Sequence, residues 1–436
     1  MKKAIASAGL LALGAVGVQS AHAQWAAGQE KPWSITGTLR GFYDDNINTQ
    51  PNGPGRVSSW GFEVRPSAGL DFENGPTTVK ASYTYALLYY TEREPNKIDQ
   101  NHDFELWMNH NFSSRDSIDF KESFVIAQEP DVLAPGSLSL YLRANGSNKR
   151  NLAAINYHAG LTRLFGLVLG YSNTYYDYSE NANNNVAPGS PSFATLLNRV
   201  EEAITLDTTW QIQEQTTGIL GYKFGWVDYT GSGSILPPSI PPVTVAPTVN
   251  NNYSHYFYVG ANENLRSDLT AYARVGVQYI SYYQTLPGNT RNQVSPYADL
   301  SLNYRYMDGG TLVVGFSNSR NQTDIPATFV PGSTNAIRLT QDQESATLYA
   351  NVIQRLTPIS PKLTATLTGQ YQNSTYNGGA VNNYTDNVYL LGLNLAYQFN
   401  RFVSAELGYN YDDVVSRVPG LGYDRNRVYI GVTASY

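Results

Sequence analysis

The feature that most constrains this chain is an alternation of apolar and polar residues with a period of two, which begins at Trp33 and continues to the last residue. It is clearest over residues 60–70, 79–87, 165–172 and 363–371. A β-strand places successive side chains on opposite faces, so each of these segments has one apolar and one polar face. No comparable helical period follows the first 23 residues. The chain is therefore predicted to be all-β.

The connections between the alternating segments are short and long in strict turn. Short connections fall at residues 73–76, 113–116, 162–164, 213–215, 307–310 and 399–401, and long ones at 44–58, 92–102, 128–150, 179–197, 230–252, 318–341 and 412–425. Outer-membrane barrels show this asymmetry, with short periplasmic turns and longer external loops. We count about eighteen alternating segments in all, an even number of strands with both termini periplasmic, as bacterial barrels require. A soluble sandwich or a β-helix also alternates, but rarely combines strands this long with such a loop asymmetry.

The fold class predicted from these patterns is a transmembrane antiparallel up-and-down β-barrel over residues 33–436. Lipid offers no hydrogen bonds to the backbone, so strands can span it only as a closed barrel. The outer-membrane lipid is thus an expected partner, and the Gram-negative outer membrane is the expected location.

The first residues predict export. Lys2 and Lys3 precede an apolar stretch over residues 4–18, and the small-x-small pattern at residues 21–23 follows it. These are the parts of a cleaved signal peptide, which we place at residues 1–23, with a short periplasmic segment over residues 24–32. The apolar stretch is shorter than the about 20 residues that span a bilayer, so a retained anchor is the weaker alternative.

The end of the chain predicts a contact with the barrel-assembly machinery. Val428, Ile430, Val432 and Ala434 alternate with polar residues and the chain stops on Tyr436. A final strand that ends on an aromatic residue resembles the C-terminal signal for this machinery, although that signal more often ends in Phe.

The composition agrees with a barrel that is wet on one side and apolar on the other. There are 34 Tyr, 15 Phe and 37 Gly, and only 15% of residues are charged, against about 25% in ordinary soluble domains. The formal net charge of -6 argues against nucleic acid as a partner, because phosphate binding needs a basic surface. The absence of Cys excludes a lipoprotein anchor, disulfides, thiolate metal sites and cysteine nucleophiles.

The two faces of the strands receive different roles. The apolar register should face lipid, with aromatic rings at the membrane interfaces, namely Tyr83, Tyr89, Tyr157, Tyr171, Trp210, Trp226, Tyr279, Tyr397 and Tyr409. The opposite register should line water, because a charged side chain has a low free energy in water and a high one in lipid. The predicted pore-lining residues are Arg40, Glu63, Arg65, Lys80, Glu105, Asp119, Lys121, Arg199, Glu201, Asp207, Lys223, Arg274, Asp299, Arg305 and Glu406. Their signs nearly balance, so the lining predicts weak ion selectivity. Glu122 and Glu202 fall in the outward register, which this assignment does not explain.

Aromatic residues also occur in the inward register. Rings beside charged and amide groups can bind sugars in a channel, so we name as saccharide contacts Trp107, Tyr256, Tyr258, Tyr272, Tyr297 and Tyr349. The competing interpretation is a Tyr-rich barrel with tyrosines on both faces and no sugar site.

Three loops suggest more specific roles. Residues 128–150 carry acidic and basic groups that would oppose each other if the loop entered the lumen, although a solvated external loop is the ordinary case. Residues 230–252 are Pro-rich and apolar, hence stiff, and would cover the mouth or meet a partner if they were more than a rigid surface loop. Asp44-Asp45-Asn46 and Asp412-Asp413 offer oxygen ligands for calcium, but without a ligand spacing they are better explained as turn residues.

No catalytic motif is present. The sequence lacks a G-x-S-x-G elbow, an H-E-x-x-H pattern and a Gly-rich phosphate loop. The histidines after residue 23 are His102, His110, His158 and His255, none beside an obvious nucleophile in sequence. We therefore predict no enzymatic activity, no catalytic residue, no metal ligand and no cofactor. A triad built from distant strands is the exception that only geometry would reveal.

Several stretches resemble one family. Residues 41–47 (GFYDDNI), the strand at 66–70, the strand entry at 101–105, the turn at 113–116 and the closing strand at 423–436 are similar to the putative beta-barrel porins found near exopolysaccharide and exosortase loci. The resemblance spans most of residues 24–436, through strand-and-turn patterns of low specificity. It implies an outer-membrane barrel without known catalysis that aids export of a secreted polysaccharide, and it supplies no functional residues.

The function predicted from the sequence is a porin-like channel for passive passage of small hydrophilic solutes or for export of a saccharide or polysaccharide. Two alternatives remain. One is a non-conducting surface barrel, plugged by its own loops, with an adhesive or structural role. The other is a barrel enzyme, which requires a hydroxyl or carboxylate beside one of the four histidines.

Overall fold

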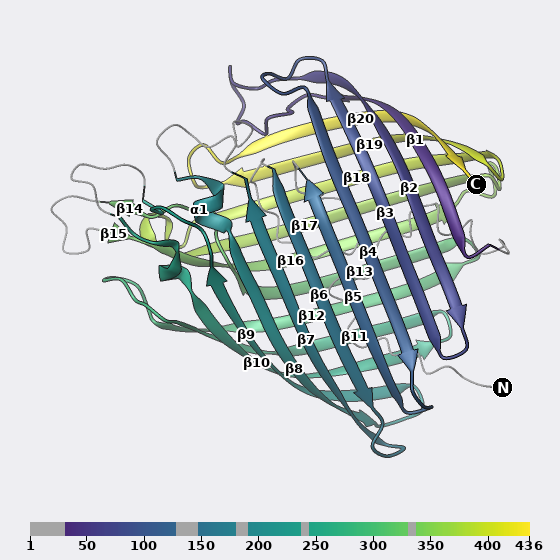
Figure 1. The fold of residues 1–436 in the computed structure, drawn as a ribbon, viewed down its shortest axis with the longest axis horizontal. Coiled ribbons are helices and arrows are strands. Elements are labelled where there is room, and N and C mark those ends of the chain that lie inside the picture. Colours follow the sequence, from purple (N-terminus) through teal and green to yellow (C-terminus); the bar gives the residue numbers. More distant parts are fainter. Residues whose placement is uncertain (1–30, 128–146, 180–190, 237–243, 330–336) are drawn as a thin grey trace.

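The computed structural model describes residues 31–127, 147–179, 191–236, 244–329 and 337–436. The expected signal peptide and the first part of the expected periplasmic segment lie outside these residues. Eighteen long strands make up the molecule (Figure 1), with these bounds: β1 Trp33–Asp44, β2 Ser59–Asn74, β3 Thr77–Tyr90, β4 Ile98–Asn111, β5 Asp116–Ala127, β6 Asn148–Ala159, β7 Phe165–Tyr178, β8 Arg199–Gln211, β9 Thr216–Tyr229, β10 Asn252–Arg266, β11 Leu269–Tyr282, β12 Asn292–Met307, β13 Gly310–Asn321, β16 Thr340–Arg355, β17 Leu363–Gly378, β18 Thr385–Asn400, β19 Val403–Ser416 and β20 Tyr423–Ser435.

Every long strand pairs antiparallel with the next one along the chain, and β1 also pairs with β20. The sheet therefore closes on itself and leaves no free edge, which is the condition for spanning lipid with strands. The predicted antiparallel barrel of about eighteen strands is confirmed. Strands such as β3, β4 and β5 cross the near side of the barrel, and β16, β17 and β18 lie behind them (Figure 1).

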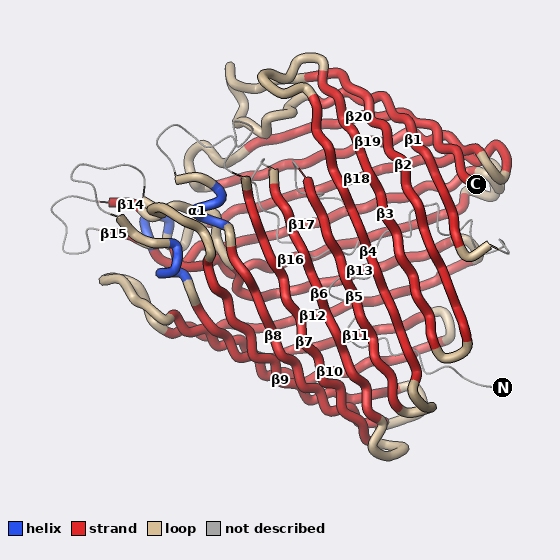
Figure 2. Tube along the Cα trace, in the orientation of Figure 1, coloured by secondary structure: helices blue, strands red, loops and turns tan. Residues whose placement is uncertain are grey.

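Short elements occur at one end of the barrel (Figure 2). They are α1 Phe193–Leu197, two 3-10 turns at Pro247–Asn250 and Gly379–Val381, and the small hairpin of β14 Thr328–Phe329 and β15 Ile337–Arg338. All belong to connections on the long-loop side, which we take as external. Within the described ranges, no helix is long and apolar enough to cross a membrane.

The structure adds four connections that the alternation did not predict and shortens several others. Among these, the predicted loop at 92–102 is shorter because β4 begins at Ile98, and that at 318–341 because β13 continues to Asn321. External loops also occur at residues 283–291 and 379–384, and turns at 267–268 and 356–362. The predicted loop at 412–425 is wrong in extent, because β19 continues to Ser416 and β20 begins at Tyr423. Asp412 and Arg425 made this segment look like a loop, but they form a buried ion pair across the two strands.

The outer face of the barrel is apolar. Nothing covers the outside of a single closed sheet, so the exposed apolar register of each strand is the outer one. It includes Leu39, Val64, Leu169, Leu206, Val275, Leu393 and Ile430, all more than a third exposed. Such a surface is stable only against lipid.

One outward contact recurs between the two strands of several external hairpins. Five tyrosines of the described strands each hydrogen-bond a polar residue on the next strand, two places nearer the external loop than the residue directly opposite. The pairs are Tyr83–His102, Tyr171–Glu202, Tyr222–His255, Tyr371–Asn387 and Tyr409–Asn426, at 2.7–3.1 Å. Each pair joins the two strands of one external hairpin. We call these five contacts the tyrosine clasps.

A second aromatic belt lies at the short-turn end. The rings of Trp33 and Tyr436 are 5.9 Å apart, and Lys31 lies over both. Phe165 packs with Trp210 at 4.6 Å between ring centroids. Aromatic belts at both interfaces are expected for a barrel in a bilayer.

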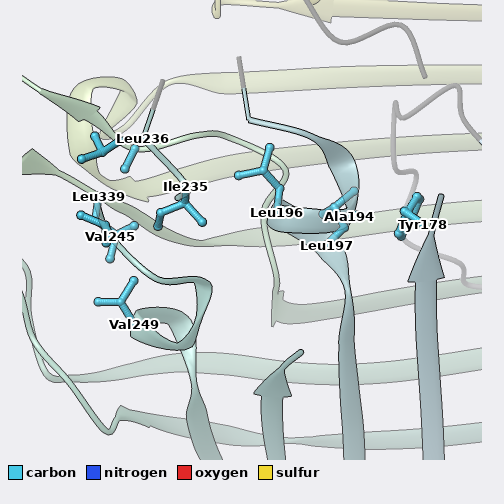
Figure 3. Packing of buried hydrophobic residues seen from close by; sticks show 10 residues of the cluster. Tyr178, Ala194, Leu196, Leu197, Ile235, Leu236, Val245, Val249 and Leu339 are labelled. Atoms are coloured by element: carbon cyan, nitrogen blue, oxygen red, sulfur yellow. The ribbon is translucent and has the colours of Figure 1, made fainter. Parts of the chain in front are cut away.

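The external loops have an apolar core of their own (Figure 3). Ile235 and Leu236 from the loop between β9 and β10 are buried with Leu196 and Leu197 of α1, and with Leu339 before β16. Ser192 caps α1 by accepting the Thr195 backbone N–H. The described apolar residues of the loop at 230–252 therefore pack within the chain. Residues 237–243 of this loop, and the charged loop segment 128–146, lie outside the described residues.

Candidate functional site

The candidate site is the inner face of the barrel. All fifteen charged residues predicted to line a pore lie in strands, in the register opposite the exposed apolar side chains. They come from β1 (Arg40), β2 (Glu63, Arg65), β3 (Lys80), β4 (Glu105), β5 (Asp119, Lys121), β8 (Arg199, Glu201, Asp207), β9 (Lys223), β11 (Arg274), β12 (Asp299, Arg305) and β19 (Glu406). Most of them form ion pairs, and two groups stand out.

The first group, here the Arg40 cluster, contains Arg40, Glu63, Arg65, Glu406 and Tyr429. Arg40 lies between two carboxylates, with Nε donating to Glu406 at 2.5 Å and Nη1 to Glu63 at 3.2 Å. Arg65 Nε lies 2.7 Å from the other oxygen of Glu63. The guanidinium of Arg40 also lies 4.9 Å from the ring centre of Tyr429. Every charge in this cluster therefore has an opposite charge beside it.

The second group, here the Arg274 cluster, contains Arg274, Asp207, Asp299, Tyr258 and Lys223. Arg274 Nη2 donates to Asp207 at 2.7 Å, and the Tyr258 hydroxyl donates to the other Asp207 oxygen at 2.5 Å. The side chains of Arg274 and Asp207 are 4% and 1% exposed, against 19% and 15% for Arg40 and Glu406. Because water does not reach a charge pair buried this deeply, the two charges are stabilised by each other and by hydrogen bonds from neighbouring groups.

The two clusters share one backbone plan. In each, a Tyr-x-Gly segment (Tyr258 to Gly260, or Tyr429 to Gly431) lies beside a strand whose arginine is directly opposite the glycine. An acidic residue on the following strand lies opposite that arginine: Asp299 for Arg274 and Glu63 for Arg40. The preceding strand places a glycine opposite the tyrosine: Gly221 or Gly408.

The clusters lie on nearly opposite walls. From β10 to β20 the pairing runs β10–β11–β12–β13–β16–β17–β18–β19–β20, which is eight steps around an 18-strand barrel. Nine steps would be the opposite side. Arg274 and Arg40 both lie mid-strand, on strands that run towards the external end. The lumen is therefore flanked by two similar arginine-centred groups.

Glycines allow the tyrosines to lie flat against the wall. A Cβ on Gly221 would come within 2.0 Å of the Tyr258 ring, and one on Gly408 within 2.0 Å of the Tyr429 ring. Gly315 is related to Tyr349 in the same way, at 2.2 Å. Rings that lie across a glycine do not project into the lumen, so this arrangement widens the space that solutes could use.

The remaining predicted charges are distributed along the lumen. Asp119 accepts from His158 at 2.7 Å and from Asn109 at 2.7 Å. Arg199, which is 2% exposed, donates to Glu201 at 2.6 Å and lies over the Tyr176 ring. Lys80 pairs with Asp71 at 3.2 Å, and both are about half exposed.

Glu105 and Lys121 sit diagonally on neighbouring strands and attract each other electrostatically. Arg305 is exposed, near the turn after β12.

The predicted saccharide contacts are brought together only in part. Tyr256, Tyr258, Tyr272, Tyr297 and Tyr349 lie on or beside the wall of the Arg274 cluster, and each is less than a tenth exposed. Tyr297 packs against Tyr256 and Tyr258, with ring centroids 5.2 and 5.6 Å apart. Trp107 lies apart from them on β4, half-buried. The tyrosine faces are thus largely occupied by each other, so a sugar would meet hydroxyls and ring edges.

Sequence reasoning missed several inward residues. Asp44 was interpreted as a turn residue, but it is fully buried and pairs with Arg427 at 2.7 Å. Asp342 accepts from Tyr282 and from Arg320, and it too is fully buried. Both acids lie near the external end of a strand, Asp44 as the last residue of β1 and Asp342 as the third residue of β16, which is why they look like loop residues.

The two outward acids now have partners. Glu202 accepts from the Tyr171 hydroxyl at 3.1 Å and from Asn173 at 3.0 Å, and Glu122 accepts from Asn151. Glu202 is therefore the polar half of a tyrosine clasp. These two hydrogen bonds explain how its carboxylate is accommodated on the outer face, and the pairing register of the strand is regular there.

The histidines show no triad among the described contacts. Three face outward, where His102 and His255 take part in clasps and His110 bonds Thr77 at 2.7 Å. Among the histidines that the structure describes, only His158 faces inward, and its partner is Asp119. Within the described ranges, no three His, Asp or Glu side chains are arranged to hold a metal ion.

The comparisons with known proteins point to the same class of molecule. Residues 332–436 match the model of the family described as Putative beta-barrel porin 2. The resemblance inferred from the sequence is thus confirmed over this stretch, which includes β16 to β20 and supplies Glu406 and Tyr429. The chain has a porin-like outer-membrane channel fold. Folds of this kind generally belong to channels and not to enzymes.

Solved structures with similar chain traces include opdK and OccK8 (OprE) from Pseudomonas aeruginosa and OccAB4 from Acinetobacter baumannii. The opdK structure is 11% identical, with 93% of this chain and 99% of that chain covered and a TM-score of 0.43. OccK8 is 12% identical, with 93% and 98% covered and a TM-score of 0.44. OccAB4 is 11% identical, with 94% and 99% covered and a TM-score of 0.42. No curated protein matches the sequence.

Proposed function

We propose that this protein is an open pore of the outer membrane that passes small hydrophilic solutes passively, saccharides among them. The observation that supports this most is the inner face itself. A closed barrel of 18 strands is too wide for side chains to fill, and its inner register is polar and charged. Such groups are stable at membrane depth only where they border water or one another.

The charge arrangement supports weak ion selectivity. The Arg40 cluster holds two arginines and two glutamates, and the Arg274 cluster holds one arginine, one lysine and two aspartates. Each cluster is formally neutral. A lining without an excess of either sign presents no strong barrier to either sign of ion.

Export of a secreted saccharide or polysaccharide is the finer form of this proposal. Its support is the family resemblance together with the tyrosines, amides and carboxylates of the inner wall. We also propose that residues 1–23 direct export as a cleaved signal peptide, and that the last strand engages the barrel-assembly machinery.

The non-conducting barrel is the rival, and one observation favours it. Five inward tyrosines and the central ion pair of the Arg274 cluster are less than a tenth exposed. That part of the wall has little contact with bulk water. A rival of this kind predicts a correctly inserted barrel that carries no current.

Single-channel recording in a planar bilayer separates the two. The sequence has no cysteine, so one introduced thiol reports on one position. Ser82 and Ala81 are adjacent on β3 and face opposite sides. We expect stable open steps, and we expect a charged, bulky thiol reagent to lower the conductance of Ser82→Cys but not of Ala81→Cys.

The outcomes discriminate clearly. Inserted protein without current, with Ser82→Cys unreactive, would establish the plugged barrel. Equal labelling effects at both positions would contradict the assignment of inner and outer faces.

A further inference from the structure

Two buried polar groups, one in the Arg274 cluster and one beside it, have incomplete hydrogen bonding. The Oδ2 atom of Asp299 and the hydroxyl of Tyr272 have no hydrogen-bond partner among the described residues. The two residues are 3% and 8% exposed. A buried polar atom without a partner costs about 1–3 kcal/mol, so native structures rarely leave one without a reason.

The two groups belong to one place on the wall. Asp299 lies opposite Arg274 on the neighbouring strand, and Tyr272 lies opposite Ser301. Asp299 and Tyr272 are therefore diagonal neighbours on the same inner face. A carboxylate oxygen that can only accept is thus near a hydroxyl that can donate or accept.

The Arg40 cluster also contains atoms without a hydrogen bond, but they lie beside an opposite charge. Glu63 Oε1 and Arg65 Nε form no hydrogen bond, yet they are 2.7 Å apart as an ion pair. Glu406 has Arg40 on one oxygen and the Asn394 amide on the other, at 3.0 Å. Asp299 Oδ2 and the Tyr272 hydroxyl differ because, among the described residues, neither atom has a hydrogen bond or an ion pair.

The chemistry of the ligand follows from charge and from the neighbouring rings. Arg274 and Lys223 offset Asp207 and Asp299, so the cluster has no net charge to attract an ion. Tyr297 lies two residues from Asp299 on the same face of β12. A neutral polyhydroxyl solute suits this place on the wall. One of its hydroxyls can donate to Asp299, another can bond Tyr272, and its C–H groups can contact the edge of the Tyr297 ring.

We propose that Asp299 and Tyr272 form a saccharide-binding subsite on the wall of the lumen. The proposal rests on the proposed pore function, because it needs solutes to reach the inner face. Both side chains stand on a single-layer sheet, so a solute in the lumen approaches from one side and displaces neighbouring side chains, not backbone.

The test is block of single-channel current by a linear oligosaccharide of four to six glucose units. We expect the current of the wild-type pore to fall with sugar concentration. Tyr272→Phe removes only a hydroxyl, so its half-blocking concentration should rise about two- to tenfold, the effect of one net hydrogen bond. The matched control is Tyr389→Phe, the same change on the outer face of β18, where the side chain is 43% exposed. It should block like the wild type.

Failure of the subsite and failure of the pore give different results. An open channel whose block is absent, or is the same in Tyr272→Phe and wild type, overturns the subsite and leaves the pore intact. A barrel without current overturns the pore. In that case calorimetric titration of the same oligosaccharide into the detergent-solubilised protein decides the subsite: weaker binding by Tyr272→Phe than by Tyr389→Phe supports it, and no binding or equal binding overturns it.

Discussion

The Arg40 and Arg274 clusters use one backbone plan in two environments. Both place arginine opposite the glycine of a Tyr-x-Gly segment and opposite an acidic residue on the other side. The Arg40 cluster is partly open and carries Arg65, which is 39% exposed, whereas Arg274 and Asp207 are almost fully covered. The comparison shows that register places charged groups, while burial decides whether they act on solutes in the lumen or on the stability of the wall.

The largest difference should appear when the central arginine is removed. Arg274→Met leaves Asp207 buried without its cation, which should lower the free energy of unfolding by about 3–5 kcal/mol. Arg40→Met leaves Glu63 its pair with Arg65 and Glu406 its bond from Asn394, so we expect a loss of about 1–3 kcal/mol. Urea denaturation from lipid vesicles measures both. Equal losses would show that the difference in burial has no energetic meaning.

The next effect concerns the glycines under the tyrosines. Gly221→Ala should push the Tyr258 ring off the wall, with a loss of about 1–3 kcal/mol from overpacking and a lower single-channel conductance. Gly408→Ala should cost less, because the Tyr429 ring is less deeply buried and has room to move. Gly37→Ala meets no atom within 4 Å and serves as the control. Conductance unchanged in all three variants would contradict the idea that flat rings widen the lumen.

Ion selectivity should respond at one cluster and little at the other. Arg65→Gln and Lys223→Gln each remove one positive charge from the inner face. We expect the cation-to-anion permeability ratio to rise roughly twofold for Arg65→Gln and to change less for Lys223→Gln. A twofold change corresponds to a fraction of the ~1 kcal/mol with which two unit charges 4 Å apart interact in water. Reversal potentials in a salt gradient give the ratio. The reverse order would mean that solutes pass closer to the Arg274 cluster.

The smallest expected effect is a pH dependence of the external loops near the two clusters. The loop near the Arg40 cluster is tied by Asp45, which binds Arg56 and Asn426, whereas the loops near the Arg274 cluster share an apolar core. Burial alone would raise the pKa of Asp45, but the hydrogen bonds from Asn426 and Arg56 outweigh it and lower that pKa.

Because its pKa is lowered, ionised Asp45 stabilises the folded loop at pH values above the ordinary pKa of an aspartate. This stabilisation is lost as the pH falls and the carboxylate is protonated. We expect amide exchange in residues 45–58 to accelerate below about pH 4 and exchange in residues 193–197 to stay unchanged. An Asp45→Asn variant should show no such step. Parallel acceleration of both regions would point to general acid unfolding instead.

The barrel was predictable because its constraints are local and repeated. Alternation over residues 60–70 or 363–371 assigns the faces of a strand without knowledge of its neighbours. The errors fell where two strands cooperate. Asp412 and Asp44 look like loop residues until Arg425 and Arg427 are known to lie beside them. Both pairings depend on the register between two strands, which are consecutive for Asp412 and 383 residues apart for Asp44 and Arg427.

The candidate site was predictable as a list of inward residues but not as two clusters. Nothing in the sequence pairs Arg274 with Asp207, which are 67 residues apart, or Arg40 with Glu406, which are 366 apart. The repeated Tyr-x-Gly segments were visible at Tyr258 and Tyr429. Their role could be recognised only in the closed sheet, because the arginine, the acidic residue and the glycine near each segment come from three other strands.

The tyrosine clasps carry a mechanical consequence. In five external hairpins the hydroxyl of an outward-facing tyrosine is bonded to a polar group two residues nearer the loop on the adjoining strand. Sliding one strand of such a hairpin past the other would break this bond and leave the hydroxyl on the apolar outer face without that partner. The clasps therefore act as five pins that hold paired strands against slippage, in addition to the backbone hydrogen bonds.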